Sequence, residues 1–391
     1  MTDDAPFPRH GRRYDLDWLR VGAFGLLILY HAGMFYVTWD WHVKSPHAGP
    51  TLEVLMLVLN PWRLALLFFI SGVGARFAAD KLPAGTFARR RLVRLGVPLL
   101  FGMLVIVPPQ SYLELREAGI IPPGFFRFYP QYLSLEQSFE IITPTWNHLW
   151  YVVYLLAYSL LLVPLHAVLQ PRASALAALM ERLFARGPWV VVAPALPFII
   201  YRFALDPYFP TTHAFVGDWA NHAHRFTIFL FGYLIAKDPS FWTAIDRNRR
   251  GAAHLALGLG VVLSLMRVVP GVERWVIDHA LALTVVRILY RLYAWWCIAA
   301  LVGWAQRRLN HPGPWLTYLN EGVYPFYIVH QTIIVVTGYT LARLGVPLAL
   351  EVAGILLATS LGCLLAYELA RRVAFLGPLL GLRTASAPSR P

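Results

Sequence analysis

The chain has 391 residues, of which 58% are hydrophobic, 14% aromatic and only 14% charged. A soluble globular protein carries about a quarter charged residues, so this chain has too few to cover soluble domains of its size. The composition therefore predicts a protein embedded in a lipid bilayer, and it excludes a disordered chain, a collagen and a disulfide scaffold. The two cysteines, Cys297 and Cys363, lie within apolar runs, where a structural disulfide is not expected.

Ten stretches of the sequence are candidates for transmembrane helices, each of which needs about 20 mostly apolar residues. They are 18–38, 52–75, 92–108, 148–169, 188–203, 223–236, 252–269, 283–304, 323–341 and 348–370. The predicted fold class is therefore all-α, a polytopic membrane bundle of about ten helices. The first apolar run is too long to be the apolar part of a cleavable signal peptide, so we expect it to remain as the first span. We expect a single integral-membrane domain over residues 1–380 and a disordered tail over residues 381–391.

The net charge of +13 reflects membrane topology rather than nucleic-acid binding. When the N-terminus is placed in the cytoplasm, 22 Lys and Arg residues fall in the inner connections and only five in the outer ones. Cytoplasmic connections of membrane proteins are rich in Lys and Arg. The asymmetry predicts that both termini are cytoplasmic. It also predicts a multi-pass protein of the cell inner membrane, in contact with the lipid bilayer and without a nucleic-acid partner.

The first span carries ionisable side chains, which are costly inside a bilayer and therefore mark candidate functional sites. Arg20 and His31 are eleven residues apart, which on a helix is three turns plus about 20°, so both project from one face. Asp17 lies one turn before Arg20 and is expected to pair with it. His31 then lies about 16 Å deeper than Arg20, as a titratable imidazole within the bilayer. A helix-entry role is the simpler alternative for Asp17.

Arginines gather at two further places. The third span begins with the run RRRLVR, in which Arg90 or Arg91 shares a helix face with Arg94, and guanidinium groups match the geometry of phosphate or carboxylate. Anchoring at the inner surface by anionic lipid is the alternative for this run. The eighth span contains Arg287 and Arg291, one turn apart. Because carboxylates are scarce inside the spans, the arginines indicate an anionic ligand within the bundle.

Aromatic and imidazole side chains mark the start of the fourth span and the middle of the ninth. The fourth span opens with His148, Trp150 and Tyr151, and the ninth contains Tyr327 and His330. These residue types in a membrane protein are candidates for contacts with a polar substrate. An ordinary position at the membrane interface is the alternative for the residues of the fourth span. A hydrogen bond between helices is the alternative for His330.

The signatures of familiar soluble enzymes are absent from the sequence. It has no HExxH zinc motif, phosphate loop, dinucleotide-binding glycine motif or GxSxG nucleophile elbow. His222 and His224 form only a weak candidate for a metal pair, because no carboxylate or thiolate in the sequence supports them. We expect no metal site and no permanently bound cofactor.

Four segments together resemble membrane acyltransferase family 3. They correspond to the family's opening LDxLR…H motif, its inner arginine motif, its HLWF segment and its late SYxxYLxH segment, and they are residues 16–20 with His31, 89–94, 148–151 and 324–330. The segments come in the family's order. Within the family they are most similar to a branch that succinylates periplasmic glucans. The chain departs from the common pattern at Glu321 and Gly322, where many members have a serine before the tyrosine, and this departure leaves the acceptor open.

The resemblance implies transfer of an acyl group, succinyl or acetyl, from cytoplasmic acyl-CoA as co-substrate to a hydroxyl of an extracytoplasmic glycan. It implies that His31 is either the general base for that hydroxyl or the carrier of the acyl group, and the sequence leaves both open. Arg20 would orient the CoA or the oxyanion, and Asp17 would position Arg20. The CoA phosphates are assigned to Arg90, Arg91 and Arg94. The acyl and acceptor groups are assigned to Arg287, Arg291, His148, Trp150, Tyr327 and His330.

A transporter or exporter is the alternative class of function. Ten spans with arginines lining a path would also suit the export of an anionic or sugar-linked solute. Many secondary transporters show matching interrupted segments in two halves of the chain, and this sequence shows no such correspondence. An intramembrane histidine above a phosphate-suited basic cluster favours the enzyme.

Overall fold

The computed structural model describes residues 12–134, 139, 141–185 and 187–382. Within these residues every regular element is a helix and none is a strand. This is expected of a chain in lipid, because a helix satisfies its own backbone hydrogen bonds where water is absent. The all-α class is confirmed. Six helical stretches are long and apolar enough to cross a membrane, and they are Pro50–Ala79, Ala84–Glu117, Asn147–Phe184, Pro239–Val268, Ala280–Arg308 and Leu348–Arg372.

The other four predicted spans also fall on helices, which are shorter or more polar. They are α1 (Tyr14–Met34), α9 (Leu196–Ala204), α10 (Trp219–Ile235) and α14 (Leu316–Arg343). Helix α1 has the length to cross a bilayer, but it carries two carboxylates in its first turn and a histidine in its last. The count of ten spans and the cytoplasmic termini therefore stay predictions.

The chain groups into two compact units, each drawn from several stretches of sequence. Unit 1 consists of Met1–Ala23, Leu57–Phe87 and Leu161–Asn320. Unit 2 consists of Phe24–Met56, Ala88–Leu160 and Glu321–Pro391. The single-domain organisation over residues 1–380 stays a prediction. Residues 383–391 of the predicted disordered tail lie outside the described residues.

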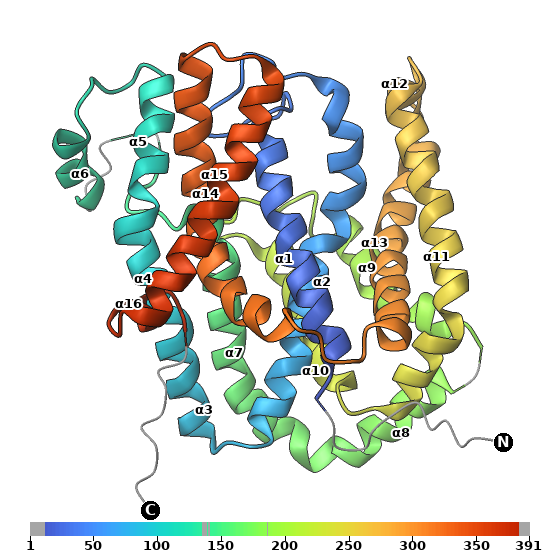
Figure 1. Ribbon diagram of the computed structural model, residues 1–391. Coiled ribbons are helices and arrows are strands. Elements are labelled where there is room, and N and C mark those ends of the chain that lie inside the picture. The colour runs from blue at the N-terminus through green and yellow to red at the C-terminus, as the bar shows by residue number, and fades with distance from the viewer. Residues whose placement is uncertain (1–11, 135–138, 140, 186, 383–391) are drawn as a thin grey trace, which may run out of the picture. The chain divides into compact units, whose positions relative to one another are not determined.

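Unit 1 is built mainly from α2 (Glu53–Ala79), α8 (Ala173–Phe184), α9, α10, α11 (Pro239–Val268), α12 (Val272–Asp278) and α13 (Ala280–Arg308). Figure 1 shows α11 and α13, in yellow and orange, running side by side. Helices α2 and α10 cross at two glycines. A Cβ atom on Gly72 would clash with the Phe229 carbonyl, and one on Gly232 with the Phe69 carbonyl. Small residues at such a crossing let two backbones approach closely within a membrane.

Unit 2 contains most of the third helical stretch, the first part of the fourth and the C-terminal helices. The third stretch is α3 (Ala84–Arg91), α4 (Val97–Phe101) and α5 (Pro108–Glu117), joined by π-helical turns at Leu92–Gly96 and Gly102–Ile106. It is followed by α6 (Phe125–Leu133) and α7 (Trp150–Leu169). The unit ends with α14, α15 (Leu348–Arg372) and α16 (Leu376–Leu379).

Helix α15 packs on α14 through small residues. Cβ atoms on Gly354 and Gly362 would lie 2.8 Å and 2.7 Å from side-chain atoms of Leu341 and Ile333. The end of α1 and the segment after it, the middle of α5, and helices α14 and α15 share a buried apolar cluster that includes Phe35, Ile334 and Ile355. This packing fixes α14, the helix on which the late histidine of the sequence lies.

Candidate functional site

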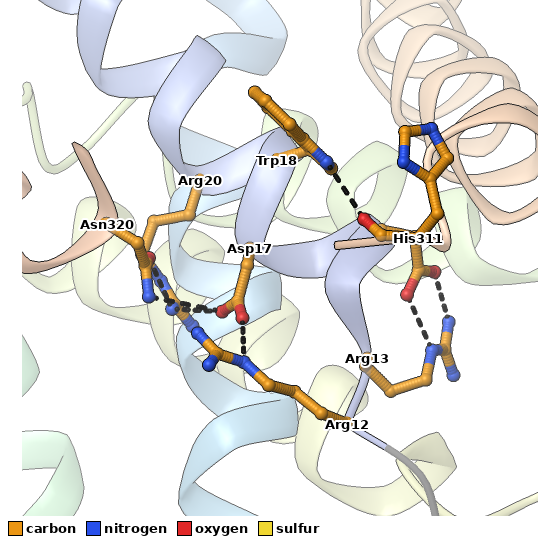
Figure 2. Close-up of polar contacts among 8 residues, drawn as sticks. Arg12, Arg13, Asp17, Trp18, Arg20, His311 and Asn320 are labelled. Atoms are coloured by element: carbon orange, nitrogen blue, oxygen red, sulfur yellow. Dashed lines mark hydrogen bonds and ion pairs between the residues drawn. The ribbon is translucent and has the colours of Figure 1, made fainter. Parts of the chain in front are cut away.

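The predicted pair of Asp17 and Arg20 is present at the start of α1, in unit 1. Arg20 Nη1 donates to Asp17 Oδ1 over 3.1 Å and also to Asn320 Oδ1 over 3.1 Å. Arg12 Nε donates to the second carboxylate oxygen of Asp17 over 2.7 Å. Figure 2 shows the Asp17 carboxylate held between the two guanidinium groups, with the Asn320 amide beside it. Asp17 therefore fixes the direction of two arginine side chains, so its role extends beyond helix entry.

His31 meets His330 in unit 2. His31 Nδ1 and His330 Nε2 are 2.7 Å apart, and the two rings are stacked with an angle of 3° between their planes. His330 Nδ1 lies 2.7 Å from the Tyr327 carbonyl oxygen, so that nitrogen must carry a proton and donate. In a neutral His330 ring, Nε2 is then the acceptor, and His31 Nδ1–H is the donor. This tautomer places the basic lone pair of His31 on Nε2.

His148 completes a histidine cluster, defined here as His31, His148 and His330. The His148 ring lies perpendicular to that of His330, with centroids 5.2 Å apart. Its Nε2–H donates to the Ile328 carbonyl over 3.0 Å. The hydroxyl of Tyr327 donates in turn to the His148 carbonyl. The short helical turn Asn147–Leu149 before α7 and the middle of α14 are thus joined at the cluster, and three imidazoles from distant parts of the sequence come together.

Trp150 and Tyr151 are buried within unit 2, with 9% and 4% of their surfaces exposed. The Trp150 ring packs edge-on against Tyr154 one turn along α7, and Tyr151 packs edge-on against Tyr327. Aromatic side chains of a membrane-interface belt face the lipid headgroups. These two face the protein interior, and Tyr151 forms part of the wall beside the histidine cluster.

The basic run of the third helical stretch lies at a change of helix type. Arg90 is an exposed residue of α3, Arg91 ends that helix and is partly buried, and Arg94 is exposed within the first π-helical turn. The Tyr324 hydroxyl, on α14, donates to the Leu95 carbonyl next to Arg94 over 3.5 Å. The basic run is therefore attached to the helix that carries Tyr327 and His330. Exposed guanidinium groups suit both a phosphate ligand and anchoring by anionic lipid.

Arg287 and Arg291 lie on α13 in unit 1, and Arg291 has a protein partner that the sequence did not indicate. Arg291 Nη2 lies 2.5 Å from Asp206 Oδ2. Asp206 also accepts from His224 Nε2 over 2.8 Å and from Arg202 over 3.3 Å. The charge is still unbalanced, because this one carboxylate faces the guanidinium groups of both Arg202 and Arg291. Among the described residues, Arg287 Nε and Arg291 Nε are buried and have no hydrogen-bond partner.

The groups around Asp206 lower the pKa of its carboxyl group. Burial alone would raise the pKa of Asp206, but the hydrogen bond from His224 and the charge of Arg291 lower it to about 2. His222, the other member of the weak metal pair, has its Nε2 2.7 Å from the Phe215 carbonyl. Both histidines of that pair therefore have protein partners of their own.

The sequence did not single out several uncharged polar residues that lie at these sites. Asn320 binds both Asp17 and Arg20, and Gln110 lies next to His148, with its Nε2 3.4 Å from His148 Nδ1. Gln331 follows His330 directly and is only 3% exposed. A buried amide needs hydrogen-bond partners, so each of these positions marks a polar interior. The available signal was a Gln or Asn within an apolar stretch, which is weaker than a charge.

The fold and the histidine cluster define a polytopic membrane protein with acid–base groups in its interior. Residues 13–368 match a family model described as "Acyltransferase domain". The chain therefore belongs to this acyltransferase family, and it is a membrane acyltransferase. The family membership favours the enzyme over the transporter.

Relatives with curated names agree with the family. "Glucans biosynthesis protein C" of Salmonella heidelberg (strain SL476) is 22% identical over 331 residues, which is 82% of this chain and 82% of the relative. The protein of the same name from Escherichia coli (strain K12 / DH10B) is 27% identical over 154 residues, which is 39% of this chain and 38% of that relative. No solved structure matches the chain.

Proposed function

We propose that this membrane acyltransferase is an O-acyltransferase of the cell inner membrane. It moves an acyl group, succinyl or acetyl, from cytoplasmic acyl-CoA to a hydroxyl of an extracytoplasmic glycan. The relatives named for glucan biosynthesis support the choice of a glycan as acceptor. The observation that carries the proposal is the contact of His31 Nδ1 with His330 Nε2, because it orients a basic imidazole nitrogen.

The tautomer derived for His31 leads to a balanced reaction step. His31 Nε2 accepts the proton of the glycan hydroxyl while the hydroxyl oxygen attacks the thioester carbonyl carbon. The new C–O bond forms, the C–S bond breaks, and CoA leaves as a thiolate that takes the proton from His31. In the alternative, Nε2 itself attacks the thioester and carries the acyl group to the hydroxyl. His330 positions His31 in both routes.

The arginines and aromatic residues have supporting roles in this proposal. The guanidinium group of Arg20, held by Asp17, orients the CoA, and the basic run at Arg90, Arg91 and Arg94 binds its phosphates. The glycan acceptor binds at His148, Trp150 and Tyr327, next to His330. Arg287 and Arg291 bind a carboxylate on the acyl or acceptor group. The partly satisfied guanidinium groups of these last two arginines support that assignment.

The test uses purified protein in detergent micelles with acyl-CoA and glucan oligosaccharides. A transporter requires two compartments, whereas an enzyme forms acylated glucan in one. We expect the wild-type protein to form this product and His31→Ala to lose it. The matched control is His254→Ala, which removes an exposed imidazole from α11. Wild-type product levels from His31→Ala would exclude this role for His31.

A further inference from the structure

A second imidazole–carboxylate pair lies in unit 2, outside the reaction step proposed above. His42 Nδ1 lies 2.5 Å from Glu114 Oε2. On its other side, His42 Nε2 lies 2.9 Å from Gln331 Nε2. Gln331 Nε2 also donates to Gln110 Oε1 over 3.0 Å. Four polar side chains therefore form one continuous chain of hydrogen bonds from the Glu114 carboxylate to the Gln110 amide, and its third member, Gln331, directly follows His330.

The donors and acceptors of this chain agree with one protonation state. The amide nitrogen of Gln331 can only donate, so His42 Nε2 accepts and carries the lone pair. His42 Nδ1–H then donates to the Glu114 carboxylate, which is a charge-assisted hydrogen bond. Gln110 Nε2 continues the chain by donating to Thr332 Oγ1 over 2.6 Å. His42 is thus held in one orientation from both ring nitrogens.

The connection that carries His42 is fixed by buried polar anchors. Lys44 Nζ donates to the carbonyls of Met34 and Val37, over 2.8 Å in each case, at the end of α1. Ser45 Oγ donates to Glu351 over 2.6 Å, and the side chain of Glu351 is fully buried. Buried carboxylates are costly unless they are bonded, so their use here implies that the position of this connection matters.

Exposure increases from one end of the chain to the other. Gln331 is 3% exposed, whereas the side chains of His42 and Glu114 are 12% and 32% exposed. His42 uses one oxygen of Glu114, so the partly exposed carboxylate has capacity to accept from a ligand hydroxyl. Trp41, partly exposed, lies beside His42 with ring centroids 5.4 Å apart. A carboxylate and an imidazole next to an indole face suit a polyhydroxylated ligand, whose hydroxyls donate and whose ring face is apolar.

We infer that Trp41, His42 and Glu114 form a binding subsite for the glycan acceptor, with Glu114 accepting a hydrogen bond from a sugar hydroxyl. The sugar ring packs against the indole of Trp41. Gln331 and Gln110 act as positioning residues that hold His42 and hence Glu114. This inference rests on the proposed function, since it assumes that the acceptor is a sugar.

The test measures glucan binding and turnover in the intact protein. Glu114→Gln keeps the size of the side chain but removes the charged acceptor. We expect it to weaken the binding of glucan oligosaccharides by about tenfold in calorimetry, and to raise KM for glucan by a similar factor with kcat within about twofold. The matched control is Glu117→Gln on the same helix, whose carboxylate is exposed and pairs with Arg343. The control should change neither quantity.

A second variant distinguishes a loss of glucan binding from a folding defect. Trp41→Ala should raise KM for glucan in the same direction, and the melting temperature of each variant in detergent shows whether it is folded. If the wild type acylates glucan and both folded variants keep its KM, the subsite is excluded and the proposed function stands. If the wild type neither binds nor acylates glucan, the proposed function fails as well, so the two failures are distinguishable.

Discussion

The imidazole rings of His31 and His330 share one hydrogen bond, with Nδ1 of the first 2.7 Å from Nε2 of the second. The backbone carbonyl of Tyr327 holds the far side of the His330 ring. The main chain of α14 therefore determines which nitrogen of His31 carries the proton. In enzymes a histidine base is commonly oriented by a second group in this way.

The first prediction concerns His330 as a positioning residue. His330→Ala removes the acceptor for His31 Nδ1–H, so His31 samples both tautomers, and we expect kcat for glycan acylation to fall by about a hundredfold. His330→Gln supplies a carbonyl oxygen as a new acceptor and should recover part of the rate. The pH–rate profile should shift in the alanine variant and return toward that of the wild type in the glutamine variant. Equal activity in the two variants would contradict this role.

The second prediction separates ligand binding from membrane anchoring at the basic run. Arg94→Ala should raise KM for acyl-CoA by about tenfold, because a guanidinium group donates two hydrogen bonds to a phosphate. Arg94→Lys keeps the charge, which suffices for lipid anchoring, but loses the paired donors. We therefore expect the lysine variant to resemble the alanine variant in KM. The exposed arginine Arg274 on α12 provides the control, and a lysine variant with wild-type KM would favour anchoring.

The third prediction concerns the choice of acyl group. Arg291→Ala removes one of the cations around Asp206 and one of the two guanidinium groups of α13 whose Nε is buried without a hydrogen-bond partner. If this region binds a carboxylate, the variant should use succinyl-CoA about tenfold less efficiently while its use of acetyl-CoA changes little. The measurement is kcat/KM for the two donors side by side. An equal loss of kcat/KM with both donors would indicate that Arg291 stabilises the structure and does not select the acyl group.

The fourth prediction follows from the acidity of Asp206. Its pKa is lowered from an ordinary 3.8 to about 2 in the folded protein, so the ionised carboxylate stabilises the folded state above about pH 4. That stabilisation is lost as the pH falls from about 4 to 2, because the carboxylate is then protonated in the folded protein as well. Between about pH 4 and pH 2 the melting temperature in detergent should therefore depend less on pH for Asp206→Asn than for the wild type. Asp278→Asn, at an exposed position, should leave the slope unchanged.

The sequence predicted the features that depend on spacing along one helix. The helical class follows from long apolar runs, and the pair of Asp17 with Arg20 follows from their separation of three residues. Both depend on local geometry alone, so a pattern is enough to find them. The sequence also singled out His31, His148 and His330, and these three imidazoles contact one another in unit 2.

The partners across the chain were not predictable in the same way. His31 and His330 are 299 residues apart, and Asp206 and Arg291 are 85 apart. Which distant side chains meet depends on helix crossings such as the one at Gly72, and a single sequence does not encode them as a periodic pattern. The pairing of Arg291 with Asp206 was missed because Asp206 lies in a connection rather than in a span.

The two π-helical turns between α3 and α5 have a consequence for the basic run. Each such turn accommodates one residue more than an α-helical turn, because its hydrogen bonds reach from i to i+5. Removing one residue between Leu92 and Gly96 would restore α-helical winding and leave Arg89–Arg91 on nearly the same side of the helix, because the wide turn already absorbs the extra residue. The direction of those cations therefore survives the loss of one residue at the wide turn, whereas the same deletion in a regular α-helix would rotate them by about 100°.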